Sequence, residues 1–227
     1  MVDKRADRVR AFYKALWGGK SHAWSAAPRR QRGTRTEVAG ALLRPGARLL
    51  DVGCWGGEGL ERMGASALFP ELHGVDLIEA SVQAARRRGI KAEVVDLNMR
   101  PLPYPDRFFD AVTCLAVIPQ VFDPEAVVAE LHRVLTPGGQ LVLSVGNVAV
   151  LPNRVRLLLG RRPRTSPDPG WDGGQLHYFT LSETHRLLER HGFDVTGVHP
   201  AGRWLAARRL WLALLSSALV FDAHRRA

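Results

Sequence analysis

Short apolar runs recur along the chain, and stretches with helical periodicity separate them. The length of these runs and their content of leucine and β-branched residues are typical of buried strands. The first five runs are residues 47–53, 71–77, 91–97, 109–117 and 139–147. The helical stretches between them are residues 58–63, 79–88 and 124–135. This alternation predicts βαβ crossovers and a mainly parallel, doubly wound sheet with helices on both faces, so the expected fold class is α/β.

The pattern changes after residue 147. Residues 148–178 are rich in arginine, proline and glycine and contain a short helical stretch near Arg154–Leu159, so we expect a lid insertion at about 148–180. Thr180 and Glu183 then form a T-x-x-E capping box, which predicts a helix that closes at Gly192.

Two further strands are expected near the end of the chain, at residues 193–199 and 217–224, with a short apolar helix around 204–215 before the second. At the other end, residues 7–17 have a helical pattern, and we expect residues 1–46 to form a helical cap. No linker is long enough to divide the remainder, so residues 47–227 are expected to form one domain.

Composition supports a globular protein: 46% of the 227 residues are apolar and 24% are charged. The longest apolar stretch, Leu210–Phe221, falls short of the roughly 20 residues that a membrane-spanning helix needs, so no membrane span is expected. The N-terminal residues lack the apolar core of a signal peptide, and Cys54 and Cys114 are too few for a disulfide scaffold. We expect two buried cysteines and a cytoplasmic protein.

The formal charge of +10 is unevenly distributed. Residues 1–48 carry twelve lysines and arginines against three acids, residues 49–150 eight against thirteen, and residues 151–227 twelve against six. The basic flanks are consistent either with a solvated surface or with a surface that faces an anion.

Each of the first three predicted strands ends in an acidic residue, at the sheet edge where open parallel sheets bind ligands. Asp51 precedes a loop with four glycines, which brings backbone close to a ligand. Asp76 can accept two hydrogen bonds from a ribose diol, and Asp96 with Asn98 can hold the amino edge of an adenine. The loop reads G-x-x-G-G-x-G rather than the G-x-G-x-x-G of nicotinamide dinucleotide sites, so we predict another kind of adenosine site.

The segments LLDVGCWGGEG, GVDL, VVDLN, FDAVTCLAV and ELHRVLTPGGQLVLSV resemble the class I S-adenosylmethionine-dependent methyltransferases, and the resemblance covers roughly residues 35 to 200. The segment from SVGN to HGFDV resembles their type 11 and type 23 domain groups. The resemblance implies a seven-stranded sheet whose last strand is antiparallel, with S-adenosylmethionine as cofactor. It implies these cofactor-binding residues: Asp51, Gly53, Cys54, Trp55, Gly57, Asp76, Leu77, Asp96, Leu97, Asn98 and Leu115.

Three departures from the family pattern affect these expectations. Trp55 stands where the family's loop usually has its middle glycine, so it is expected to narrow the cofactor loop. Gly146 replaces a frequent proline. Pro119 and Gln120 stand where metal-dependent quinone O-methyltransferases place an acid and a histidine, so no catalytic metal is expected.

A sulfonium is already a strong electrophile, so such an enzyme mainly aligns a nucleophile and, where needed, removes its proton. We expect metal-independent, in-line methyl transfer to a small molecule, most simply to oxygen or nitrogen. His177 is the candidate base, and a structural role as a lid anchor is its alternative. Candidate substrate contacts are Asn147, Tyr178 and Tyr13, and the arginines at 154, 156, 161, 162 and 164 suit an anionic substrate.

Two other functions stay open on the sequence alone. The basic flanks suit RNA, although the turn after the fourth strand, Ala116–Gln120, lacks the N-P-P-Y-like motif of exocyclic-amine methyltransferases. Trp55 is also compatible with a non-catalytic scaffold that keeps the fold without binding the cofactor.

Overall fold

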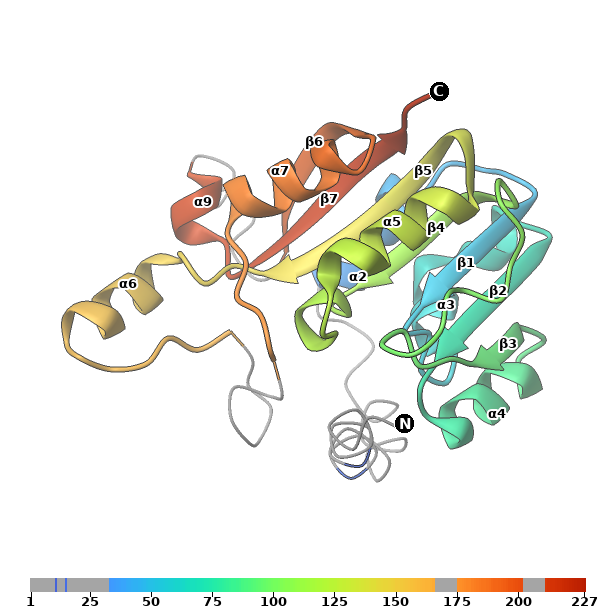
Figure 1. Ribbon diagram of the computed structural model, residues 1–227, viewed down its shortest axis with the longest axis horizontal. Coiled ribbons are helices and arrows are strands. Elements are labelled where there is room, and N and C mark those ends of the chain that lie inside the picture. The colour runs from blue at the N-terminus through green and yellow to red at the C-terminus, as the bar shows by residue number, and fades with distance from the viewer. Residues whose placement is uncertain (1–10, 12–14, 16–32, 166–174, 202–210) are drawn as a thin grey trace.

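A computed structural model describes residues 33–165, 175–201 and 211–227, together with residues 11 and 15 (Figure 1). The helix predicted at 7–17 and the candidate Tyr13 therefore lie outside the described residues, apart from those two positions. Most of the helix predicted around 204–215 lies outside them too.

A single seven-stranded sheet forms the centre of the described structure, in the order β3-β2-β1-β4-β5-β7-β6. The strands are β1 (Arg48–Val52), β2 (Glu71–Asp76), β3 (Lys91–Val94), β4 (Phe109–Leu115), β5 (Leu135–Gly146), β6 (Phe193–Ala201) and β7 (Ala218–Arg225). The first five pair in parallel, and β7 runs antiparallel to both β5 and β6. The α/β fold with an antiparallel last strand is thus confirmed.

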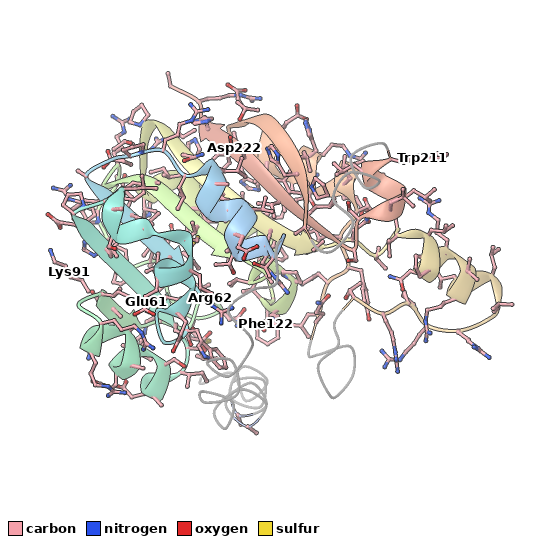
Figure 2. The ribbon with its side chains drawn as sticks, turned by 180° about the vertical axis from the view of Figure 1, so that it is seen from behind. Glu61, Arg62, Lys91, Phe122, Trp211 and Asp222 are labelled. Carbon is pink, nitrogen blue, oxygen red and sulfur yellow. The ribbon has the colours of Figure 1, made fainter. Side chains whose placement is uncertain are left out.

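Helices cover both faces of this sheet, as Figures 1 and 2 show from opposite sides. They are α2 (Arg35–Leu42), α3 (Glu58–Met63), α4 (Glu79–Arg87), α5 (Pro124–Val134), α6 (Leu151–Leu158), α7 (Leu181–Arg190) and α9 (Leu212–Leu215). Leu131 of α5 and Leu188 of α7 belong to one buried apolar cluster, whereas Ala39 of α2 and Leu60 of α3 belong to another. Of the helices described, none is long and apolar enough to cross a bilayer.

Two boundaries differ from the sequence prediction. Strand β5 begins at Leu135, directly after α5, because Leu135 pairs with Phe109 before the register shifts and pairing resumes at Gln140 with Ala111. Gly138 adopts a left-handed φ of 74° inside this irregular part. Strand β3 ends at Val94, so Asp96 lies in the turn beyond the strand.

Helix α2 is missing from the sequence prediction, which placed a helix only at 7–17. Thr34 and Glu37 form a complete capping box at its start, the same T-x-x-E signal that correctly identified α7. The short length of α2 and its weakly amphipathic sequence, RTEVAGAL, made it hard to recognise.

The buried side chain of Gln140 ties α2 to the sheet. Its Nε2 donates to the carbonyl oxygen of Leu42, 2.9 Å away, and to Oδ1 of Asp222, 2.7 Å away. Its Oε1 accepts from the backbone N–H of Arg44 at 3.1 Å. The side-chain amide of Gln140 on β5 therefore forms hydrogen bonds both with the end of α2 and with a buried carboxylate on β7 (Asp222 is labelled in Figure 2).

Replacing Gln140 with leucine should lower the free energy of unfolding by about 2 to 3 kcal/mol, because three polar groups, those of Leu42, Arg44 and the buried Asp222, lose their partner. Chemical denaturation monitored by circular dichroism measures this. The matched control is Gln83→Leu on the exposed side of α4, where only a side-chain contact with Glu79 is lost. Equal stabilities of the two variants would contradict the role assigned to Gln140.

Candidate active site

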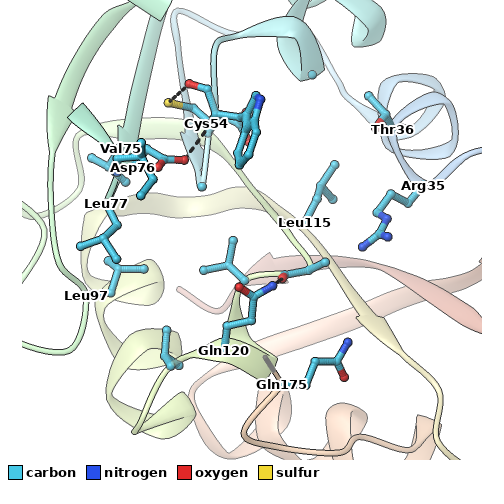
Figure 3. A pocket seen from close by; sticks show the side chains of 18 of the residues that line it. Arg35, Thr36, Cys54, Val75, Asp76, Leu77, Leu97, Leu115, Gln120 and Gln175 are labelled. Atoms are coloured by element: carbon cyan, nitrogen blue, oxygen red, sulfur yellow. Dashed lines mark hydrogen bonds between the residues drawn. The ribbon is translucent and has the colours of Figure 1, made fainter. Parts of the chain in front are cut away.

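A pocket of about 460 Å³ opens at the carboxyl ends of β1, β2 and β4, and Figure 3 shows it from close by. It is the sheet edge at which the sequence placed the adenosine site. All but one of the predicted cofactor residues line it: Asp51, Gly53, Cys54, Trp55, Asp76, Leu77, Asp96, Leu97, Asn98 and Leu115. The pocket is also lined by residues that the sequence did not suggest, among them Arg35, Thr36, Glu58, Gln120, Thr165 and Gln175.

The glycine loop after β1 is held tightly against β2. The backbone N–H groups of Gly53 and Cys54 both donate to the carbonyl oxygen of Val75, at 2.8 and 3.1 Å. Gly53 has a φ of 76°, and a Cβ at this position would lie 2.4 Å from Cγ2 of Val117. Glycine is therefore required here by backbone conformation and by space.

Asp76 joins this loop to the end of β2. Its Oδ2 accepts from the backbone N–H of Trp55 and its Oδ1 from that of Ile78, both at 2.9 Å. Burial raises the pKa of this carboxyl, and the backbone hydrogen bonds oppose the rise. Each carboxylate oxygen retains a second lone pair, so Asp76 can hold the loop and still accept hydrogen bonds from a ligand.

Asp51, at the end of β1, is almost fully buried. Its Oδ1 accepts from the Thr113 hydroxyl at 2.6 Å. The pKa of Asp51 is raised from 3.8 to about 7: burial is the main cause of the rise, the Thr113 hydrogen bond opposes it, and the charge of Asp76 adds to it. A nearby positive charge would lower the pKa of this carboxyl and favour its ionised form.

The turn after β3 presents Asp96, Leu97 and Asn98 to the pocket. Asp96 Oδ1 accepts from the backbone N–H of Asn98 at 3.1 Å, which closes the turn. Asn98 Oδ1 accepts from the backbone N–H of Phe122 at 2.7 Å and so links this turn to the segment before α5.

More acidic than basic side chains line the pocket. Four acids line it, Asp51, Glu58, Asp76 and Asp96, and Arg88 pairs with Glu58 at 3.0 Å. Arg35 is the one base among the described residues that line the pocket, and Figure 3 places it across the pocket from Asp76 and Leu97. A pocket lined by several carboxylates and a guanidinium suits a ligand that carries both a positive charge and a carboxylate.

Comparison with known proteins identifies this arrangement. Residues 50–143, which run from β1 into β5, match the family described as "Methyltransferase domain". The chain contains a methyltransferase domain. Its matched residues include most of the pocket described above, from Asp51 to Gln120.

Curated relatives of the methyltransferase domain are similar over part of their length. A 27-O-demethylrifamycin SV methyltransferase of Amycolatopsis mediterranei is 35% identical over 67% of this chain and 60% of its own. A ubiquinone biosynthesis O-methyltransferase of Xanthomonas oryzae is 37% identical over 48% of this chain and 47% of its own. A demethylmenaquinone methyltransferase of Symbiobacterium thermophilum is 31% identical over 63% and 56%. The chain thus spans about half to three fifths of the length of these relatives.

Solved structures share the fold. The cyclase SpnF superposes with a TM-score of 0.68 at 20% identity, covering 98% of this chain and 97% of its own. An S-adenosylmethionine-dependent methyltransferase of Mesorhizobium loti superposes with a TM-score of 0.62 at 22% identity, covering 84% and 98%. At these identities the likeness shows the Rossmann-like methyltransferase fold and nothing finer.

Gly57 is the predicted cofactor residue that does not line the pocket. It precedes α3 with a φ of 88°, and a Cβ there would lie 2.4 Å from Cδ1 of Ile90. Glycine at this position permits the left-handed backbone turn and the close packing against Ile90. The neighbouring positions Glu58 and Gly59 line the pocket instead.

Both cysteines are buried and free, as predicted. The Cys54 thiol packs against Gly74, where a Cβ would lie 2.7 Å from the sulfur, and burial raises its pKa. Burial raises the pKa of the Cys114 thiol to about 12. Neither thiol is therefore prepared as a nucleophile.

Asn147 lies beyond the described pocket lining, at the end of β5. Its Nδ2 donates to the carbonyl oxygens of Ala213 and Ser216, at 2.8 and 2.9 Å, and its Oδ1 accepts from the backbone N–H of Ala149. The side-chain amide thus joins β5 to α9. A substrate contact by Asn147 stays a prediction, and these bonds give the residue a structural task.

His177 and Tyr178 also lie outside the pocket lining. The His177 backbone N–H donates to the carbonyl oxygen of Pro119, and its Nε2 lies 3.2 Å from the carbonyl oxygen of Phe122. These contacts hold the segment after residue 174 against Ile118–Gln120, as the lid-anchor alternative expects. Tyr178 is 39% exposed. Their roles as base and substrate contact stay predictions.

The raised pKa of Asp51 predicts a pH-dependent stability. Because the folded state holds the Asp51 proton up to about pH 7 and the unfolded state releases it near pH 4, the free energy of unfolding falls as pH rises through this window. Asp51→Asn removes this loss, on the order of 3 kcal/mol. The melting temperature of the variant relative to the unchanged ligand-free protein should therefore rise from pH 5 to pH 8.

Differential scanning fluorimetry across this pH range measures the difference. Asp194→Asn is the control, because Asp194 is exposed and paired with Arg226 on the surface. A difference between Asp51→Asn and the unchanged protein that stays constant with pH would contradict the assignment.

Proposed function

We propose that this protein is an S-adenosylmethionine-dependent methyltransferase that acts on a small-molecule acceptor by metal-independent, in-line transfer. The observation that carries the proposal is the pocket at the strand ends, in which Asp76 fixes the glycine loop and Arg35 lies across the pocket from Asp76. A volume of about 460 Å³ is within the range of cofactor and small-molecule sites.

The residues present fit this cofactor. Asp76 would accept the ribose hydroxyls, and Asp96 with Leu97 and Asn98 would hold the adenine. Asp51 would face the positively charged methionine end, and Arg35 would receive its carboxylate. When bound, S-adenosylmethionine supplies a methyl group on an electrophilic sulfonium, so the protein's own task is to orient the acceptor and to exclude water.

The acceptor would enter from the side of the pocket lined by Gln120, Thr165 and Gln175. Gln120 Nε2 donates to the carbonyl oxygen of Ala116 at 3.2 Å, which fixes its amide beside the pocket centre. The Thr165 hydroxyl donates to Gln175 Oε1, so these two lining residues are in direct contact. Amide and hydroxyl groups suit a neutral polar acceptor, and we propose them as its contacts.

The names of the curated relatives support a small organic acceptor, since they concern rifamycin, ubiquinone and menaquinone precursors. Two of these names specify methylation at oxygen, which favours O-methylation here. The likeness to a cyclase shows that this fold also serves other reactions, so detection of a methylated product is required in addition to cofactor binding.

Asp76→Ala should weaken the binding of S-adenosylmethionine and S-adenosylhomocysteine by about ten- to hundredfold, because it removes a charged acceptor and releases the Trp55 N–H. Isothermal titration calorimetry of both ligands measures this. Asp194→Ala, which removes an exposed carboxylate elsewhere, should bind as the unchanged protein does. A folded, unchanged protein that binds neither ligand would overturn the proposal and favour the scaffold alternative.

Arg35→Gln should distinguish the binding of the amino-acid end of the ligand from the binding of its adenosine end. S-adenosylhomocysteine carries the amino-acid carboxylate, whereas methylthioadenosine lacks it. We expect the variant to bind the first about tenfold more weakly and the second unchanged, because a charge-assisted hydrogen bond is lost only to the carboxylate. Asp76→Ala should weaken both. Equal losses for both ligands in Arg35→Gln would place Arg35 elsewhere than at the carboxylate.

A further inference from the structure

Helix α6 lies on an arm that leaves the sheet beyond the end of β5, and Figure 1 shows it projecting away from the rest of the fold. We define the arm as residues 147–165. Its shape depends on polar contacts to its own backbone: Asn153, the buried residue of α6, exchanges two hydrogen bonds with the backbone of Arg164, and Arg156 Nε donates to the carbonyl oxygen of Arg162.

The large apolar side chains of α6 itself, and that of Leu159 just after it, are not buried by this folding. Leu151, Val155, Leu157, Leu158 and Leu159 are 44, 46, 56, 86 and 65% exposed. At 100° per residue, Leu151, Val155 and Leu158 share one face of α6, and Leu159 extends it. Asn153 is on the opposite face, which is turned toward the arm's own backbone, so the apolar face is turned outward.

The charge around this apolar face has one sign. Residues 147–165 contain five arginines and no aspartate or glutamate. Arg154 and Arg156 lie on either side of the apolar face, and Arg161, Arg162 and Arg164 follow it. An exposed apolar face with arginine on both sides is the pattern of helices that bind at a lipid–water interface.

A second feature lies at the same end of the molecule. Trp211, just before α9, is 64% exposed and is labelled in Figure 2 on the side from which α6 projects. Asn147, at the base of the arm, donates to Ala213 and Ser216 and so connects the arm to α9. Tryptophan is enriched where protein meets the headgroup region of a bilayer.

We propose that the arm is a membrane-surface anchor: its arginines bind anionic lipid headgroups, and Leu151, Val155, Leu158 and Leu159 insert among the acyl chains. A projecting helix needs no matching groove in a bilayer, whereas a protein partner would have to supply an apolar groove with an acidic rim. The arginines on both sides of the apolar face match headgroups that surround inserted side chains.

The anchor would bring the pocket close to the lipid surface. Gly146, just before the arm, and Thr165, at its end, both line the pocket. Lipid binding itself does not depend on the proposed methyl transfer, because no residue of α6 lines the pocket. Failure of one proposal would therefore leave the other intact.

Vesicle flotation with the full chain tests the anchor. The protein should float with vesicles of phosphatidylcholine containing about 30% phosphatidylglycerol, and only weakly with phosphatidylcholine alone or in about 1 M salt. Leu158→Ser combined with Leu159→Ser should reduce partitioning at least about tenfold. Arg161→Gln combined with Arg164→Gln should reduce it about fivefold for each arginine removed.

Val94→Ser is the matched control for the leucine variant, because Val94 is 42% exposed on the edge strand β3 at the other end of the sheet. It should float as the unchanged protein does. Circular dichroism and calorimetric binding of S-adenosylhomocysteine show whether each variant remains folded.

An introduced cysteine reports insertion directly. Since Cys54 and Cys114 are buried, Leu158→Cys can be labelled selectively with an environment-sensitive fluorophore. Anionic vesicles should shift its emission to shorter wavelength and leave a label at Val94→Cys unchanged. Absence of vesicle binding by the folded protein, flotation of the leucine variant at the unchanged level, or self-association that depends on Leu158 in light scattering without vesicle binding would each overturn the proposal.

Discussion

The two backbone hydrogen bonds that Asp76 accepts are the constraint on which the pocket depends. The N–H groups of Gly53 and Cys54, which share the Val75 carbonyl oxygen, also hold the glycine loop after β1 to β2. The loop contains three left-handed residues, Gly53, Trp55 and Gly57, over a short stretch of chain. A non-glycine residue in this conformation is held there by its surroundings, and Asp76 supplies one such contact to the Trp55 N–H.

The strand-end acids could be predicted because the residues next to each of them in the sequence identify its position in the fold. Each of Asp51, Asp76 and Asp96 follows an apolar run that identifies a buried strand, and parallel strands bring their carboxyl ends to one edge. The different tasks of the glycines could not be separated in this way. Gly53 faces the pocket and Gly57 faces Ile90, yet both are glycines in one loop, and only the packing partner distinguishes them.

Contacts between distant segments account for what the sequence did not reveal. Arg35 and Thr36 reach the pocket because Gln140, about a hundred residues later, bonds to the end of α2. No periodicity relates these positions. Asn147 shows the opposite case: a polar residue at a strand end suggested a substrate contact, whereas its amide bonds to residues 66 and 69 positions later, a contact that no local pattern reveals.

The fold places the acidic and the basic segments of the chain on different surfaces. The acidic middle third contributes Asp51, Glu58, Asp76 and Asp96, which converge on one pocket. The basic last third contributes the arginines of the arm, which lie outside that pocket. Opposite charges on two neighbouring surfaces would attract each other if the arm were free to fold back. The hydrogen bonds of Asn153 and Arg156 fix the conformation within the arm, and those of Asn147 join the base of the arm to α9 and so oppose such a movement.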